Sequence, residues 1–174
     1  MATRIEIAHG DITEFAADAI VNAANSSLLG GGGVDGAIHR VGGPQIVAEA
    51  RRLRETQFVD GMPAGRAIST NAGKLPAKWV IHTVGPVYSR GEDLSETLTS
   101  CYVESMELAD KLSAASIAFP AISAGAYGWP VDDAARIAVE AVRSTDTQID
   151  LVTFVLYNDE AFAAFEKALA SPTA

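Results

Sequence analysis

An amide, a run of glycines and a carboxylate lie close together near the start of the chain. Four consecutive glycines, residues 30–33, stand between Asn25 and Asp35. A glycine backbone can adopt positive φ and lets a phosphate or ribose approach its amides, while the N-terminus of a following helix attracts an anion. Asn25 can hydrogen-bond a ribose hydroxyl, and Asp35 can accept a proton from water or orient it. This stretch predicts a ligand-binding loop with reactive groups on both sides.

A second loop of small residues follows a later strand. Residues 123–128 come after the predicted strand 116–119 and lead through Pro130 into a helix. In open α/β sheets ligands bind beyond the carboxyl ends of the strands, so we expect both loops to meet at one crevice. There their amides would hold a diphosphate without Lys or Arg. Tight turns alone would explain a single glycine, but four in a row before a helix favour a ligand.

Histidine supplies a further candidate. His39 lies four residues after Asp35, so the two side chains can share one face of a helix, and we include His39 among the candidate catalytic residues. A partly buried structural histidine is the alternative. We interpret His82, within an apolar strand, and Asn22, at a strand end, as structural. With His9 there are three histidines, and no pair has the spacing of a zinc site, so we expect no metal.

Patterns of strands and helices alternate along the chain. Strands are predicted at residues 4–8, 19–22, 66–71, 78–84, 116–119 and 151–157, and helices at 35–41, 45–53, 94–112, 131–143 and 159–169. Beyond the first two strands, one internal pair, the third and fourth, follow each other without a helix between them. We therefore expect one three-layer α/β/α domain over residues 1–174, with a mixed, mostly parallel sheet.

Composition narrows the classes of function. A chain of 174 residues, 48% of them hydrophobic, can bury the core of one domain. The formal net charge of −9 argues against a broad footprint on nucleic acid. The single cysteine, Cys101, excludes an internal disulfide and is interpreted as a small buried hydrophobe. Neither a leader pattern nor a stretch of membrane-spanning length is seen, so we expect a cytoplasmic protein without a membrane partner.

The first glycine loop also invites comparison with the dinucleotide-binding fingerprint. Gly31, Gly33 and Gly36 match its spacing, as a glycine run matches many patterns. No strand ending in Asp or Glu follows about twenty residues later, where the fingerprint requires one. The sequence therefore argues against a nicotinamide-dependent oxidoreductase.

Several motifs occur together in a recognisable order. They are G-D-I-T at 10–13, N-A-A-N at 22–25, G-G-G-G-V-D-G-A-I-H-R at 30–40, L-P-A-K at 75–78, I-H-T-V-G-P at 81–86 and A-F-P-A-I-S-A-G-A-Y-G-W-P at 118–130. From about residue 4 to the last predicted helix, the chain resembles macrodomains of the MacroD type. The resemblance implies the macro fold, binding of ADP-ribose, removal of ADP-ribose from acidic side chains of proteins, and deacetylation of O-acetyl-ADP-ribose.

The resemblance also implies an adenine site. Asp11 is similar to the family carboxylate that accepts a hydrogen bond from the adenine amino group, with the Ile12 backbone beside it. Tyr157 is similar to the aromatic residue that stacks on adenine. An Asx turn is the alternative explanation for Asp11, and a place in the core is the alternative for Tyr157.

At the other end of the ligand, Asn25 and Asp35 resemble the catalytic pair of the family. Two roles for Asp35 stay open, because the diphosphate of the ligand could itself hold the water while Asp35 orients the substrate. A carboxylate stabilised by the start of a helix is the purely structural alternative. The expected ligand-binding residues, besides this pair and the adenine site, are Gly32, Gly33, Val34, Ser123, Ala124, Gly125, Ala126 and Tyr127.

The chain departs from the family pattern in two places. The family usually has S-T-G-V-Y-G-F-P where this chain has Ala124, Ala126 and Trp129. Backbone amides survive these changes, so we expect binding to persist, with the Tyr127 ring as a lid. Residues 56–65 replace a shorter turn of the family, and Asp60 there either reaches the substrate or caps a turn.

These observations predict a hydrolase that removes ester-linked ADP-ribose from Asp and Glu side chains and deacetylates O-acetyl-ADP-ribose. We expect no cofactor, because this hydrolysis needs none. A non-catalytic reader of ADP-ribose is the first alternative, although it would not need Asn25 and Asp35. A hydrolase of ADP-ribosylated nucleic acid is the second, and we expect nucleic acid as a partner only in that form. The expected partners are ADP-ribose, O-acetyl-ADP-ribose and ADP-ribosylated proteins. Nothing in the sequence demands a dimer, so we expect a monomer.

Overall fold

The computed structural model describes residues 2–172, and Met1, Thr173 and Ala174 at the ends of the predicted domain lie outside them. The elements in chain order are β1 (Arg4–His9), the 3-10 helix η1 (Ile12–Glu14), β2 (Ala19–Ala24), α1 (Gly33–Gly42), α2 (Pro44–Thr56), β3 (Ala67–Asn71), β4 (Trp79–Val84), α3 (Ser95–Lys111), β5 (Ser116–Phe119), α4 (Val131–Ser144), β6 (Leu151–Leu156) and α5 (Asp159–Ala170). Within these residues, no helix has the length and apolar character needed to cross a membrane.

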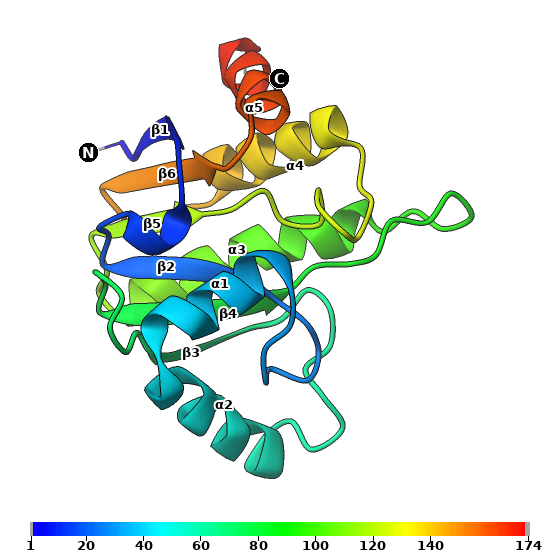
Figure 1. Cartoon of the computed structure of the whole chain (residues 1–174). Helices are drawn as coiled ribbons and strands as arrows, with labels where there is room; N and C mark the ends of the chain where they lie inside the picture. The colour runs from blue at the N-terminus through cyan, green and yellow to red at the C-terminus, as the bar shows by residue number, and fades with distance from the viewer. Residues whose placement is uncertain (1, 173–174) are drawn as a thin grey trace.

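The strands form one six-stranded sheet in the order β1-β6-β5-β2-β4-β3 (Figure 1). Every neighbouring pair is parallel except β3 and β4, which are antiparallel. The central strands β2 and β4 are almost continuously buried, as expected for parallel strands covered on both faces. The predicted mixed, mostly parallel sheet is confirmed.

Helices cover both faces of this sheet (Figure 1). The larger apolar core lies between the sheet and α3, α4 and α5, and includes the ring cluster Tyr102, Phe119, Phe154 and Phe165. Two smaller apolar clusters lie under α1 and α2, around Ile20 and Val80 and around Ala24 and Val84. The predicted three-layer α/β/α architecture is therefore confirmed.

Several element boundaries differ from those predicted, for physical reasons. The α1 helix begins at Gly33, because the Gly36 N–H already donates to Gly32 O at 3.2 Å, so Gly33 and Val34 form its first turn and do not belong to the loop. Gly33 itself has a φ of +60°, which glycine tolerates. Pairing of β2 with β4 continues to Ala24, two residues beyond the predicted strand end. The β6 strand ends at Leu156, so Tyr157 follows the strand. The short helix η1 was not predicted, because its helical bonds arise from a cap at Asp11.

Candidate functional site

Two loops leave the same edge of the sheet beside each other. The β2 and β5 strands are parallel neighbours, with Ala19 opposite Ile117 and Ile20 opposite Ala118. Their carboxyl ends therefore lie at one edge, where β2 continues into residues 25–32 and β5 into residues 120–130. The structure places the two predicted binding loops next to each other, as the order of elements suggested.

Asn25 organises the first loop. Its Oδ1 accepts hydrogen bonds from Ser27 N at 3.0 Å and from Ser27 Oγ at 2.5 Å, and its Nδ2 donates to Gly30 O at 3.0 Å. The amide group is only partly buried, and Nδ2 carries a second hydrogen. Asn25 thus shapes the loop and keeps one donor for a ligand.

Asp35 lies in the first turn of α1, with its side chain buried. Its Oδ1 accepts a hydrogen bond from Asn22 Nδ2 at 2.8 Å, whereas its buried Oδ2 has no hydrogen-bond partner among residues 2–172. A Cβ placed on Gly31 would lie 2.9 Å from Asn25 Nδ2 and 3.2 Å from Asp35 Oδ2. The two candidate catalytic side chains therefore converge beside Gly31, where only glycine leaves them room.

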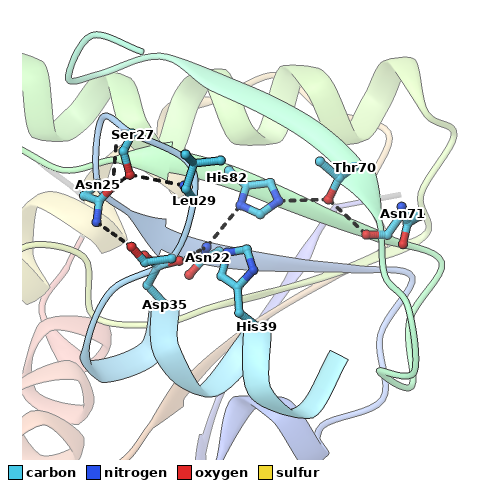
Figure 2. Close-up of polar contacts among 10 residues, drawn as sticks. Asn22, Asn25, Ser27, Leu29, Asp35, His39, Thr70, Asn71 and His82 are labelled. Carbon is cyan, nitrogen blue, oxygen red and sulfur yellow. Dashed lines mark hydrogen bonds and ion pairs between the residues drawn. The ribbon is translucent and has the colours of Figure 1, made fainter. Parts of the chain in front are cut away.

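His39 lies one helical turn after Asp35 (Figure 2). The two side chains share a face of α1, as predicted from their spacing, and His39 Nε2 is 3.3 Å from Asp35 Oδ1. Both ring nitrogens are buried and make no hydrogen bond within the part of the chain that the structure describes. The ring can therefore interact with Asp35 or with a group that enters beside it.

The second loop and the start of α1 present backbone amides. In residues 2–172, Gly125, Ala126 and Tyr127 donate no backbone hydrogen bond from their N–H groups. Gly32 is the N-cap of α1 and provides no side-chain cap, so the first N–H groups of the helix are also free. Such amides suit the oxygens of a diphosphate.

Ser123 and Trp129 fix the second loop to its surroundings. Ser123 has a φ of +67°, and its buried hydroxyl donates to Pro86 O at 2.7 Å, which leaves its backbone as the part available to a ligand. The Trp129 indole N–H donates to Asp133 Oδ2 at 2.9 Å, and its ring is buried. The departure from the family pattern at Trp129 therefore adds an anchor between the loop and α4.

Residues 85–88 support this loop, a role that sequence reasoning missed. Tyr88 N donates to Tyr127 O at 2.9 Å, and the Tyr88 ring contacts Trp129 edge-on, with ring centroids 5.2 Å apart. In the sequence, Gly85 and Pro86 were noted only as part of the I-H-T-V-G-P motif and were given no role in the site. Residues 85–88 follow β4, which pairs with β2, so they leave the sheet at the same edge as the first binding loop. That position was the signal that could have revealed their role.

The two side chains predicted to bind adenine, Asp11 and Tyr157, follow the ends of β1 and β6, which pair with each other at one side of the sheet. His9 of β1 lies opposite Leu156 of β6, so Asp11 and Tyr157 emerge close together. Asp11 Oδ1 accepts hydrogen bonds from Thr13 N at 2.9 Å and Thr13 Oγ1 at 2.7 Å, so the Asx turn does form, and the residue stays exposed. Tyr157 is 80% exposed, which rules out the interpretation as a core residue. Ile12 is buried beside them.

The long loop at 56–65 is attached to the first binding loop. Met62 N donates to Ser26 O at 2.9 Å, and the Arg54 guanidinium donates to Phe58 O and to Val59 O. Asp60 is exposed and makes no hydrogen bond within the described residues, so it caps no turn there. The other alternative for Asp60, contact with the substrate, stays a prediction.

Other chemical groups of the chain lie apart from these loops. Cys101 is buried and donates to Val84 O, and burial raises the pKa of its thiol, which disfavours the thiolate. A groove of about 800 Å³ over α4 and α5 has Arg136, Arg143 and Lys167 in its lining and no residue of either binding loop. Within residues 2–172, no group of three or more His, Cys, Asp or Glu side chains is arranged to hold a metal.

Comparison with known proteins gives consistent matches. Residues 21–138 match the Macro domain family. A Macro domain-containing protein from Streptomyces coelicolor is 61% identical over 167 residues, which cover 96% of this chain and 99% of that protein. An O-acetyl-ADP-ribose deacetylase from Citrobacter koseri is 49% identical over 173 residues, 97% of either chain. A macrodomain mutant from Oceanobacillus iheyensis, determined with ADPR, is similar in structure with a TM-score of 0.90 and 39% identity, over 96% of this chain and 92% of that one.

Proposed function

This chain belongs to the Macro domain family, and we propose that it binds ADP-ribose and hydrolyses esters on the distal ribose of that ligand. The proposed substrates are O-acetyl-ADP-ribose and ADP-ribose linked to Asp or Glu side chains of proteins. The name of the Citrobacter koseri relative and the ADPR in the Oceanobacillus iheyensis structure support the choice of ligand.

The ligand is proposed to lie along the carboxyl edge of the sheet. Adenine would stack on Tyr157 and donate its amino group to Asp11, next to the Ile12 backbone. The diphosphate would bind the amides of Gly32, Gly33 and Val34 on one side and of residues 123–127 on the other. The free amides of Gly125, Ala126 and Tyr127 support this placement, because an anion satisfies them without a basic side chain.

One observation carries the proposal of catalysis. The buried Asp35 Oδ2 has no partner within residues 2–172, and it shares the space beside Gly31 with Asn25 Nδ2. An unpaired carboxylate oxygen costs free energy when buried, so its retention beside a binding loop favours a role in binding water or substrate. A reader of ADP-ribose would need the amides of the loops but not this pair.

The proposed reaction is ester hydrolysis. Asn25 binds a hydroxyl of the distal ribose, and Asp35 Oδ2 takes a proton from water as the water oxygen attacks the acyl carbon. A bond forms between the water oxygen and the acyl carbon, and the bond from that carbon to the ribose oxygen breaks. The ribose oxygen leaves as a hydroxyl, and the acid is released as a carboxylate with one proton passed to solvent. His39, beside Asp35, is proposed to assist this transfer.

The first test is release of ADP-ribose from a protein modified on glutamate, together with hydrolysis of O-acetyl-ADP-ribose and calorimetric binding of free ADP-ribose. We expect binding and turnover of both esters by the wild type. Binding without either turnover would make the chain a reader. A parallel assay uses ADP-ribosylated DNA, and release from that substrate alone would instead favour the nucleic-acid substrate.

Variants of Asp35 test its role in the reaction. Because the loop amides stay in place, Asp35→Ala should keep a Kd for ADP-ribose close to wild type while turnover falls by about 10²- to 10⁴-fold. Asp35→Asn keeps a polar group but cannot take a proton, so it should lose as much turnover as the alanine variant. Substantial activity in Asp35→Asn would mean that the diphosphate activates the water. Asp146→Asn, at an exposed position before β6, is the control.

A further inference from the structure

Three polar side chains cross the sheet beneath α1. Asn22 of β2 lies opposite His82 of β4, and Thr70 of β3 lies two residues from Ile68, the partner of His82, so all three face the same side. Each is at most 2% exposed. This polar row separates the apolar cluster around Ile20 and Val80 from the cluster around Ala24 and Val84 (see Figure 2 for the row itself).

The hydrogen bonds of this row have one consistent set of directions. Thr70 Oγ1 donates to Asn71 O at 2.9 Å, so toward His82 Nε2, 2.8 Å away, it must accept. His82 therefore carries its proton on Nε2, which leaves a lone pair on Nδ1. That lone pair accepts one N–H of Asn22 Nδ2 at 3.1 Å, and the second N–H of the same nitrogen donates to Asp35 Oδ1 at 2.8 Å.

The charge state of His82 agrees with these directions. Burial, followed by the nearby His39, lowers its pKa to about 4, against a smaller opposite effect of Asp35. The titratable groups that face the ring are thus His39 and Asp35 of α1, while β2 and β3 present the neutral Asn22 and Thr70. A charged ring would carry a proton on Nδ1 and oppose the amino group of Asn22. The neutral ring is the form that keeps the row connected.

We propose that Thr70, His82 and Asn22 act as positioning residues for Asp35, a role that rests on the proposed function. The fixed His82 tautomer sets the orientation of the Asn22 amide, because a flipped amide would turn its oxygen toward the Asp35 carboxylate and the His82 lone pair. The amide then holds Asp35 Oδ1, which leaves Oδ2 directed at the space beside Gly31. In this proposal Asn22 orients the Asp35 carboxylate and does not itself contact the ligand.

Retention of these groups in the core is costly. Asn22 Oδ1 is buried without a hydrogen-bond partner in residues 2–172, and an unsatisfied buried acceptor destabilises the fold. Apolar residues at the three positions would fill the same layer between two apolar clusters. We attribute the retention of the polar groups to their effect on the orientation of Asp35.

Thr70 is the residue to change, because it makes no hydrogen bond to Asp35 and is three hydrogen bonds away from it, with His82 and Asn22 between them. Thr70→Val keeps the branched shape but removes the acceptor of the His82 Nε2–H. We expect kcat for O-acetyl-ADP-ribose to fall by about ten- to a hundredfold, with KM and the Kd of ADP-ribose close to wild type. Thr70→Ser keeps the hydroxyl and should restore most of the lost kcat.

Nitrogen-15 NMR of the His82 ring gives a readout that does not depend on turnover. The wild type should show a protonated Nε2 and an unprotonated Nδ1 at neutral pH, and Thr70→Val should show a mixture of tautomers. A wild-type ring protonated on Nδ1 would overturn the proposal. So would wild-type kcat in Thr70→Val below its melting temperature. If the wild type hydrolyses neither ester, the proposed function fails. The NMR result still decides which groups donate and which accept in the hydrogen bonds of the polar row.

Discussion

The two oxygens of the Asp35 carboxylate have different surroundings. Oδ1 is held by Asn22 and lies 3.3 Å from His39 Nε2, whereas Oδ2 has no partner among residues 2–172. One oxygen can therefore fix the orientation of the group while the other exchanges hydrogen bonds with water or substrate. This division allows a single carboxylate at the start of a helix to be both ordered and reactive.

The Tyr157 ring tests the adenine end of the proposed site. Because the ring is exposed and follows β6, Tyr157→Ala should leave the fold intact but remove a stacking surface. Stacking contributes about 1–3 kcal/mol, so calorimetry should give a Kd for ADP-ribose about 5- to 150-fold weaker, with kcat little changed. Tyr157→Phe keeps the ring and should bind like the wild type. Equal affinity in all three proteins would place adenine elsewhere.

Loops at the carboxyl ends of β2, β4 and β5 form one connected set. Residues 56–65 bond the β2 loop through Met62 and Ser26, and the β5 loop bonds the segment after β4 through Ser123 and Pro86. Each loop is therefore held by another loop as well as by its own strand. Such mutual support lets backbone amides keep fixed positions without regular secondary structure.

Gly85 shows how closely these loops approach each other. A Cβ at this position would lie 2.4 Å from Ser123 Oγ and 2.7 Å from Ile122 Cγ2, both parts of the neighbouring loop. Gly85→Ala should therefore push the β5 loop outward, weaken binding of ADP-ribose and lower the free energy of unfolding by about 1–3 kcal/mol. Calorimetry and urea unfolding measure the two effects.

Gly91→Ala is the matched control for this change. Gly91 lies in the same segment between β4 and α3, and its nearest neighbour to an added Cβ would be Ser89 Oγ at 3.9 Å. The control should match the wild type in stability and affinity. If Gly85→Ala also matches it, the contact between the two loops does not determine binding.

For the whole molecule, the buried His82 links stability to pH. Its pKa falls from the ordinary 6.5 to about 4, mainly because burial disfavours the charged ring. Between these values the unfolded chain binds a proton that the folded chain does not. The contribution of His82 to the free energy of unfolding is therefore constant above pH 6.5. It falls by about 3 kcal/mol in total as the pH drops to 4, and it changes no further below that pH.

Urea unfolding between pH 4.5 and 7 measures this linkage. The free energy of unfolding of the wild type should rise with pH by up to about 1.4 kcal/mol per unit more than that of His82→Gln. His9→Gln, which removes a half-exposed imidazole, is the control. A pH slope that stays unchanged in His82→Gln would contradict the prediction, whatever the absolute stability of that variant.

Much of the fold was predictable from local pattern. Periodicity marked all six strands and all five α-helices that the structure describes, and their alternation gave the three-layer architecture. The errors were the missed 3-10 helix η1 and boundaries such as the start of α1 and the end of β6. Those boundaries depend on which strands pair and on capping bonds, which a hydrophobic pattern does not report.

The sequence by itself located the two loops that are predicted to bind the ligand, because glycine content and the turn from strand to helix are local properties. It also placed Asp35 and His39 on one helical face, since their spacing of four residues fixes it. Only the tertiary structure decided that Asn22 and His82, which sequence reasoning set aside as structural, meet each other and Asp35. They are 60 residues apart, and Thr70 joins them from a third strand. Such contacts depend on sheet order and register, and these are settled by the packing of the whole chain.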